Sequence, residues 1–491
     1  MIAALALTAS LTLAQAPSDR VSAAGYYRIM TRPDFMGGYG ELGFWNLYGR
    51  LLNEGPFAAL EMKLDIIQAP PGSLDPWASI VVRLEGGTIA NADGGNGSLA
   101  QFRVAQLYAR AGNLFFKDVT WQLGTLRYYY GDLGLYDMRP ATLFNETIGL
   151  SGTWKSKWVD VLFGVGDSGF GTRGLQYVPI LTAGGGVRIR AGNHVELGGG
   201  GQYGYEPFIA GDQYSSYVTP GINYEDYLRK QVVQKFIENN PGQANEFPKP
   251  APSKTPNTSW NAIAYLGFGG FGPLIWSSFY LSYRKLHPLN FYTETFQNQS
   301  FNIYVGDLTR DRTSLLMGNE MQFVLIPDRL HAAWAVLYGD DTDLANKIQA
   351  SEANRIYYST VLRLQAYLTR TVHLLVETSL AQEKSKNGNL WRNHYDSIFA
   401  SSHGTADSQG LEYGDSNVRN TWQGKIGFVL NPSGLGIYAR PSIRLLYGVQ
   451  WSSAQAAFGN GFVDSLSQFN NFPSQEQHWH HLISLESEGW F

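Results

Sequence analysis

Hydrophobic and polar residues alternate along the chain in segments of roughly ten residues, the length that a tilted β-strand needs to cross a bilayer. In residues 57–66, one face carries the apolar side chains of Ala58, Leu60, Met62, Leu64 and Ile66. The opposite face carries Phe57, Ala59, Glu61, Lys63 and Asp65. The segments 77–85 and 421–430 alternate in the same way. This period of two predicts strands with one apolar face and one more polar face.

The closing segment, residues 480–491, follows the same pattern. Ile483, Leu485 and Phe491 lie on one face of the expected strand, while Glu488 and Trp490 lie on the other. An alternating strand that ends on an aromatic residue is typical of the last strand of an outer-membrane β-barrel. A half-buried terminal strand of a soluble sheet would alternate too, so the rest of the chain has to decide between them.

The lengths of the connections favour the barrel. Short turns rich in Gly, Pro, Asn and Asp are expected at 53–56, 191–193, 327–329, 368–371 and 431–434. Long polar connections are expected near 86–99, 205–258, 286–315, 339–355, 383–418 and 452–476. Asp340 and Asp341 would then lie in one of these long connections. Outer-membrane barrels alternate short periplasmic turns with long external loops, which soluble sandwiches do not usually do.

We therefore predict an all-β fold, a transmembrane antiparallel β-barrel of about 18 strands in the bacterial outer membrane. The barrel would span residues 25–491 as a single unit, and 205–258 would be a long loop inserted in it. The composition agrees, because charged residues make up only 16% of the chain while aromatic residues make up 14%, with 55 glycines for tight turns. The net charge of −4 does not suggest a nucleic-acid partner, and without cysteines there are no disulfides or thiolate metal sites.

The first residues resemble an export signal. Residues 1–16 form an apolar run that ends in Ala14-Gln15-Ala16, the Ala-x-Ala pattern of a signal-peptide cleavage site. No Lys or Arg precedes this run and Pro17 follows the expected cut, so cleavage elsewhere before Gly25 is also open. After residue 16 no apolar run is long enough to form a transmembrane helix.

The inward faces of the expected strands combine aromatic rings with charged groups. Tyr26 shares a face with Arg28, and Trp490 shares one with Glu486 and Glu488. Trp276 lies with Arg284, and Tyr438 lies with Arg440 and Arg444. A sugar packs the C–H face of its ring on aromatic surfaces and exchanges hydrogen bonds through its hydroxyls with ionised groups. The pattern is therefore typical of a sugar pathway, although any one of these aromatics alone could be packing or girdle.

At these residues the sequence resembles the maltoporin family of sugar-specific porins. The similar stretches, in the order of the family's own motifs, are Gly25-Tyr26-Tyr27-Arg28, Glu61-Met62-Lys63-Leu64, Phe102-Arg103-Val104-Ala105 and Arg440-Pro441-Ser442-Ile443-Arg444. The resemblance implies a homotrimer of eighteen-stranded barrels. It also implies an oligosaccharide substrate such as a maltodextrin, which a line of aromatics guides through the pore between polar tracks.

Carried over by position, the resemblance assigns candidate sugar-binding residues. The aromatic slide would comprise Tyr26, Trp276, Tyr438 and Trp490. The polar tracks and constriction would comprise Arg28, Arg50, Glu61, Arg103, Asp132 and Asp137. No catalytic residue, metal ion or cofactor is predicted.

The sequence departs from the family where selectivity is set. Ala59 stands at the place of a slide tyrosine, with Phe57 on the same face as a possible substitute. In the expected constriction loop, Tyr130 stands where an arginine is usual, and Arg139 stands at about the site of the family's narrowing tyrosine. These changes put maltodextrin in question more than sugar transport.

Three alternatives remain from the sequence. A general or anion-leaning porin would depend on the inward arginines rather than the aromatics. A barrel lipid hydrolase would need an outward Ser–His pair, whereas Ser484 and His480 both fall on the inward face. An adhesion or receptor barrel plugged by its loops would conduct nothing.

Overall fold

The computed structural model describes residues 20–33, 46–70, 72–86, 103–169, 180–206, 257–286, 291–296, 299–304, 312–343, 355–386, 418–452 and 479–491. The expected signal peptide, 1–16, and most of the long loop insertion, 205–258, lie outside these residues. No helix among the described residues is long and apolar enough to cross a membrane.

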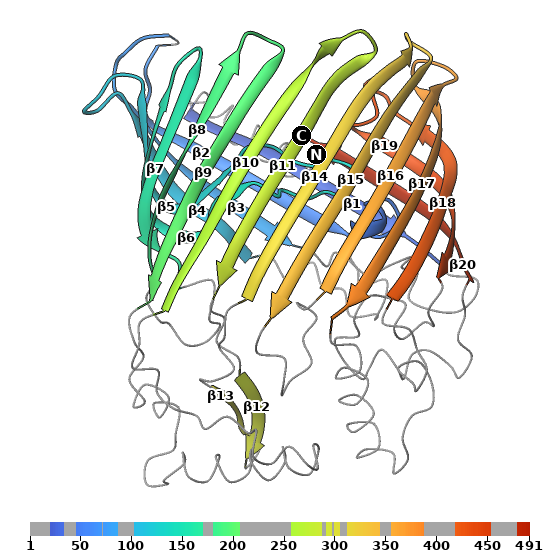
Figure 1. The fold of residues 1–491 in the computed structure, drawn as a ribbon. Helices are drawn as coiled ribbons and strands as arrows, with labels where there is room; N and C mark the ends of the chain where they lie inside the picture. Colours follow the sequence, from blue (N-terminus) through green and yellow to red (C-terminus); the bar gives the residue numbers. More distant parts are fainter. Residues whose placement is uncertain are drawn as a thin grey trace.

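Eighteen antiparallel strands form one closed sheet (Figure 1). The first nine are β1 (Val21–Thr31), β2 (Phe57–Ile67), β3 (Trp77–Gly86), β4 (Arg103–Gly112), β5 (Val119–Tyr129), β6 (Thr142–Lys155), β7 (Val159–Asp167), β8 (Leu181–Ala191) and β9 (Val195–Glu206). The other nine are β10 (Asn257–Phe271), β11 (Leu274–Leu286), β14 (Arg312–Ile326), β15 (Leu330–Asp343), β16 (Arg355–Tyr367), β17 (Val372–Ser385), β18 (Val418–Leu430), β19 (Ser442–Ser452) and β20 (Trp479–Trp490). A separate hairpin, β12 (Phe291–Phe296) and β13 (Gln299–Tyr304), lies in the connection between β11 and β14.

The two ends of the chain close the ring. β1 pairs with β2 on one side and with β20 on the other, so that Tyr26 lies opposite Trp490. Gly25 and Phe491 exchange both backbone hydrogen bonds, at 2.8 and 3.1 Å. A side chain at Gly25 would clash with the Phe491 ring, because an added Cβ would lie 2.1 Å from its Cζ. A closed sheet leaves no strand edge unpaired, which is what a barrel in lipid requires.

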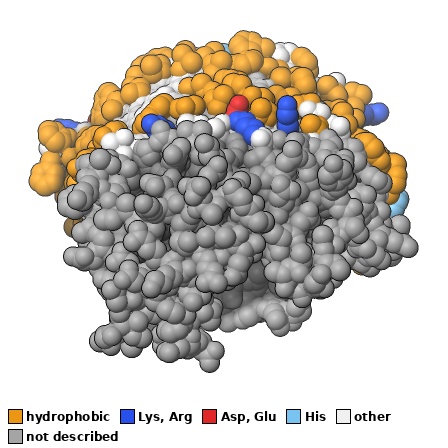
Figure 2. Space-filling view, turned by 60° about the horizontal axis from the view of Figure 1, so that its bottom comes forward, with side chains coloured by type: hydrophobic (Ala, Val, Ile, Leu, Met, Phe, Trp, Pro, Cys, Tyr) orange, Lys and Arg blue, Asp and Glu red, His pale blue; other side chains and the backbone are white. Residues whose placement is uncertain are grey.

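The polarity of the wall is that of a membrane protein. On β18, Ile426 and Phe428 expose 48% and 54% of their surface, while Lys425 exposes only 3%. Hydrophobic side chains cover the visible outer wall (Figure 2). Soluble proteins place their apolar side chains inside, so the inverted arrangement identifies the outer face as lipid-facing. The structure is a transmembrane β-barrel of the bacterial outer membrane.

The predicted strand faces are confirmed. Leu64 and Ile66 on β2 are exposed on the outer wall, as are Leu485 and Phe491 at the end of the chain. Glu488, on the other face of β20, is fully buried inside. The strand count also agrees with the expected number of about 18.

The connections separate by length onto the two ends of the barrel. The turns after β8, β14 and β16 occupy only 192–194, 327–329 and 368–371, whereas the connections on the opposite end include 207–256 and 386–417. The expected turn at 431–434 begins the connection 431–441 between β18 and β19. Three of the five predicted short turns are therefore confirmed as connections, whereas at 431–434 a turn forms but does not by itself connect the two strands.

Two predictions about connections are wrong. Residues 53–56 are not a hairpin turn, because no strand directly precedes them and they end the connection between β1 and β2. Asp340 and Asp341 lie on β15 rather than in a loop, opposite Leu315 and Ser314 of β14. The ladder continues past the apolar part of these strands because its hydrogen bonds are made by the backbone, whatever the side chains.

Two connections fold into the barrel. The 46–56 segment contains the short helix η2 (Asn46–Tyr48), and its Leu47 and Leu52 are almost completely buried. The 130–141 segment, between β5 and β6, buries Leu133 and Tyr136. A backbone hydrogen bond of 2.8 Å from Arg50 N to Leu135 O joins the two segments. Together they narrow the interior.

Candidate functional site

The interior of the barrel holds a cavity of about 960 Å³ beside the two inward segments. The side chains that line it come from β1, β2, β3, β5, β6, β10, β11, β14 and β20, from the 46–56 and 130–141 segments and from the connection between β18 and β19. Its lining includes nine aromatic side chains, namely Tyr26, Phe57, Tyr129, Tyr130, Tyr265, Trp276, Tyr280, Tyr438 and Trp490.

A cluster of three aromatic rings stands where the barrel closes. The Tyr26 ring centroid lies 4.6 Å from that of Trp490 and 5.9 Å from that of Phe57. The guanidinium of Arg440 lies over the Trp490 ring, 5.0 Å from its centroid. Trp490 keeps 58% of its surface exposed although it belongs to the inward face of β20. This ring surface is therefore open to a solute in the cavity.

Glu488 organises the polar groups behind this cluster. Its carboxylate accepts a hydrogen bond of 2.6 Å from the Tyr26 hydroxyl and forms ion pairs with Arg50, Arg440 and Arg444 at 2.5 to 2.7 Å. The side chain is fully buried, so these donors replace the water that an isolated carboxylate would need. Three separate parts of the chain are thereby fixed to β20.

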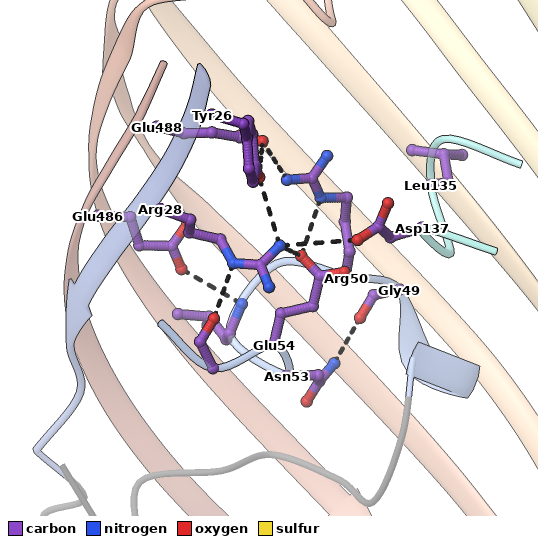
Figure 3. A network of polar contacts seen from close by, with 12 residues as sticks. Tyr26, Arg28, Gly49, Arg50, Asn53, Glu54, Leu135, Asp137, Glu486 and Glu488 are labelled. Carbon is purple, nitrogen blue, oxygen red and sulfur yellow. Dashed lines mark hydrogen bonds and ion pairs between the residues drawn. The ribbon is translucent and has the colours of Figure 1, made fainter. Parts of the chain in front are cut away.

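A second group of charges joins β1 to both inward segments (Figure 3). Arg28 forms an ion pair with Glu54 and lies 3.7 Å from a carboxylate oxygen of Asp137. Arg50 also contacts Glu54, at 3.2 Å. Burial raises the pKa of the Glu54 carboxyl to about 7, although the charges of Arg50 and Arg28 act against it. Burial acts in the same direction on Asp137, but its hydrogen bond with Glu54 and the charge of Arg50 hold its pKa below the ordinary value.

Hydrophobic contacts and buried ions hold the 46–56 segment against one side of the barrel. Leu51 and Leu52 pack with Leu375, Val429 and Leu446 on the inner wall of β17, β18 and β19. Beneath them, Glu377 forms ion pairs with Arg363 and Lys425 at 2.6 and 2.8 Å. Lys425 Nζ also donates to the Tyr48 carbonyl at 3.1 Å. None of these wall residues lines the cavity.

The 130–141 segment is fixed by β11 and β14. Leu135 N donates to Glu320 Oε2 at 2.9 Å, and the Tyr280 hydroxyl donates to the Asp132 carbonyl at 3.3 Å. Tyr438 donates to the other Glu320 oxygen at 2.6 Å and lies against Gly134, where an added Cβ would come within 2.9 Å of its ring. Burial and the nearby charge of Glu320 raise the pKa of the Tyr438 phenol well above its ordinary value. Tyr438 is thus a brace for this segment as well as a part of the cavity wall.

Eight of the ten predicted site residues line this one cavity. They are Tyr26, Trp276, Tyr438 and Trp490 among the aromatics, and Arg28, Arg50, Asp132 and Asp137 among the polar residues. Glu61 lies on β2 outside the lining, 3.8 Å from Arg83. Arg103 begins β4 with its backbone opposite Glu85, and its side chain is outside the part of the chain that the structure describes.

Tyr438 reaches the cavity in a different way from the one expected. The sequence predicts a strand that carries Tyr438, Arg440 and Arg444 on one face, but β19 begins only at Ser442. Tyr438 and Arg440 lie in the connection 431–441, which turns into the lumen, and contacts with Glu320 and Glu488 fix them there. Alternation cannot extend through residues that are outside the ladder.

Other residues of the site are not in the predicted set. Arg83, Arg127 and Arg139 all line the cavity, as do Glu85, Tyr129 and Glu320. The alternation of residues along β3 places Arg83 and Glu85 on the inward face, so the sequence could have indicated them as site residues. Arg127 lies at a register irregularity between Leu126 and Tyr128, and Tyr129 follows it, so simple alternation could not place them.

The chain resembles several solved outer-membrane channels and porins weakly in structure. No family model matches the chain, and no curated relative is detected. Among solved structures, the outer-membrane channel DcaP of Acinetobacter baumannii matches with 11% identity over 74% of this chain and 91% of its own, at a TM-score of 0.42. The anion-selective porin of Comamonas acidovorans matches with 10% identity over 96% and 99% of the chains, at a TM-score of 0.41. OprD of Pseudomonas aeruginosa matches with 8% identity over 96% and 95%, at 0.40. None of these three is described as a maltoporin, and at such values the likeness carries no argument about function.

Proposed function

We propose that this protein is a passive outer-membrane channel for the facilitated diffusion of sugars, with oligosaccharides as its substrate. The observation that carries the proposal is the Tyr26–Trp490–Phe57 cluster, whose open Trp490 face lies beside charged groups in a water-accessible cavity. Aromatic faces bind the C–H surface of a pyranose, and flanking Arg and Asp side chains exchange hydrogen bonds with its hydroxyls.

The dimensions of the site support this proposal. The cavity of about 960 Å³ is at the upper end of the range of roughly 300–1,000 Å³ for small-molecule sites. Trp276 supplies a further ring in the same lining, and its indole N–H is already satisfied by Ser278 at 3.0 Å. Trp276 is therefore a second aromatic surface of the same cavity wall, and its polar hydrogen already has a partner.

Single-channel recording in planar bilayers with maltotriose tests this function. We expect the sugar to block the current reversibly, and Trp490→Ala to weaken the block about ten-fold, the effect of losing about 1.4 kcal/mol of binding. Trp479→Ala is the matched control, because Trp479 lies on the outer face of the same strand and exposes 47% of its surface there. Absence of block by any neutral sugar in the unaltered channel would refute the proposal.

A second candidate, an anion-leaning porin, is favoured by one observation. The cavity lining holds seven arginines, Arg28, Arg50, Arg83, Arg127, Arg139, Arg284 and Arg440, against the four carboxylates of Glu85, Asp132, Asp137 and Glu320. Reversal potentials in a salt gradient separate the two, since a general anion channel would prefer chloride and show no block by sugars.

The position of Ser484 does not support the alternative of a lipid hydrolase. This residue is fully buried on the inner face, and its hydroxyl donates to Glu486 Oε1 at 3.2 Å. A lipid hydrolase would need its nucleophile near the lipid interface.

The proposed partners are an oligosaccharide, the surrounding lipid and two further copies of this chain in a homotrimer. The homotrimer rests on the resemblance of the sequence to maltoporins. Its test is the mass of the detergent-solubilised protein by light scattering, and a stable monomer would refute it.

A further inference from the structure

The charges of the cavity fall into two groups that differ in their counter-charges. Arg28, Arg50 and Arg440 form ion pairs with buried carboxylates of Glu54 and Glu488 behind the lining. Each of these three guanidinium groups therefore has a carboxylate of the protein within ion-pair distance.

The second group is Arg83, Arg127 and Arg139, and among the described residues only Arg83 has carboxylates within ion-pair distance. These residues come from β3, from the end of β5 and from the 130–141 segment, and all three line the cavity. Arg83 forms an ion pair with Glu85 at 2.7 Å. Among the described residues, Arg127 and Arg139 form no ion pair, and the guanidinium of Arg139 stacks on the Tyr129 ring, 4.6 Å from its centroid.

Among the described residues, the carboxylates that interact electrostatically with these two arginines are already engaged. Glu85 is the acidic group that acts on Arg127, but it is bonded to Arg83. Asp137 is the acidic group that acts with Arg139, but it interacts with Glu54 and Arg28. Arg127 also lies within the electrostatic range of both Arg139 and Arg83. Like charges held together without counter-charges are unfavourable, and a bound anion would relieve this repulsion.

We propose that Arg83, Arg127 and Arg139 form a carboxylate-binding subsite, so that the preferred substrate is an acidic sugar such as a uronate oligosaccharide. This inference rests on the proposed sugar channel and names its substrate class. A uronate offers the two kinds of surface that the cavity presents, an apolar ring face for Trp490 and Tyr26 and a planar carboxylate for the guanidinium groups. Arginine is the side chain best shaped to bind a carboxylate with two parallel hydrogen bonds.

The test compares two ligands that differ only in charge, a galacturonate trimer and its fully methyl-esterified form. Current block by each is measured in planar bilayers on the full-length channel. We expect the acid to bind at least about ten-fold more tightly than the ester, since charge-assisted hydrogen bonds are roughly twice as strong as neutral ones. In the double variant R127Q/R139Q the two affinities become about equal, while that for the ester stays unchanged.

Arg190→Gln is the matched control. Arg190 is an arginine of β8 outside the cavity lining, and it forms an ion pair with Asp160. Its loss removes one positive charge from the barrel, as R139Q alone does, and should leave the preference for the acid intact. Folding of each variant is checked by its heat-dependent mobility on gels, and R139Q alone serves if the double variant does not fold.

The outcomes separate this inference from the proposed function. Block by the ester and by maltotriose with no preference for the acid overturns the subsite and leaves the sugar channel standing. No block by any of the three ligands overturns the sugar channel itself. A preference for chloride over potassium with equal affinity for acid and ester also overturns the subsite, because the arginines would then act on small inorganic anions only.

Discussion

Two sides of the barrel interior differ in how their charged side chains are paired. Along β16 to β20, Glu377 and Glu488 are surrounded by arginine and lysine partners, and the 46–56 segment covers that wall. Along β3 and β5, the arginines face the cavity with few carboxylates to meet them. The first side is a sealed structural wall and the second is open to solutes. Charge on the first side stabilises the fold, whereas charge on the second is available for recognition.

The largest effect is expected from breaking the sealed side at Glu488. Glu488→Ala leaves Arg50, Arg440 and Arg444 together without their shared carboxylate. Loss of one partner from a buried ionic network costs about 3–5 kcal/mol, so we expect the free energy of unfolding in lipid vesicles to fall by that amount. Glu61→Ala is the control, because its pair with Arg83 is long and partly exposed, and it should cost at most about 1 kcal/mol. Equal losses for both variants would contradict the proposed importance of Glu488.

A smaller loss is expected when the 46–56 segment is loosened from its wall. Leu52 is fully buried against β17 to β20, and Leu52→Ala should cost about 2–5 kcal/mol through the cavity that it leaves. Because this segment fills part of the interior, single-channel conductance should rise. A variant that is less stable but has unchanged conductance would show that the segment does not limit the pore.

The open side should respond in the opposite way. R127Q/R139Q removes no ion pair among the described residues, so the free energy of unfolding should change by less than about 0.5 kcal/mol. The ion selectivity should nevertheless shift from anions towards cations, as measured by the reversal potential in a potassium chloride gradient. Strong destabilisation of this variant would place these arginines with the structural charges instead.

A pH dependence of stability is also expected at the junction of the two inward segments. Since burial raises the pKa of Glu54 from 4.5 to about 7, folding favours its protonated form. The native state therefore holds more protons than the unfolded state between these values, and stability falls as the pH rises from about 4.5 to 7. Asp137, with its lowered pKa, is already ionised throughout this range.

Unfolding measured from pH 5 to pH 8 checks this sign. Glu54→Gln should flatten the profile in that interval, because the amide keeps the size of the side chain and cannot ionise. A profile that is equally steep in the variant would assign the titration to another group.

Much of the barrel could be predicted because its determinants are local. A strand in lipid must show apolar side chains outward at every second residue, so Leu64 and Ile66, or Ile426 and Phe428, indicate their faces directly. Once the faces are known, Tyr26, Arg28, Trp276 and Trp490 follow as inward residues. Their placement in one cavity agrees with this reasoning, while their role in sugar binding remains a proposal.

The parts that could not be predicted depend on contacts between distant residues. The 46–56 segment has no alternation, and its position results from leucines that pack on β17 to β20 and from Lys425. Tyr438 is held by Glu320, 118 positions earlier in the chain. Arg127 changes its direction at a register irregularity that only the pairing of β5 with β6 defines.

The sequence by itself determined the barrel, its membrane-facing surface and the inward position of Trp490, because apolar and polar residues alternate along each strand. The tertiary structure alone decided which inward charges are neutralised and which face the cavity. The sequence places Glu488 on a strand and Arg139 in a loop, both facing the interior, but it does not say which of the two charges has partners. The difference arises because Glu488 meets three arginines from separate parts of the chain, while the described partners of Arg139 are an aromatic ring and a carboxylate that other residues already bind.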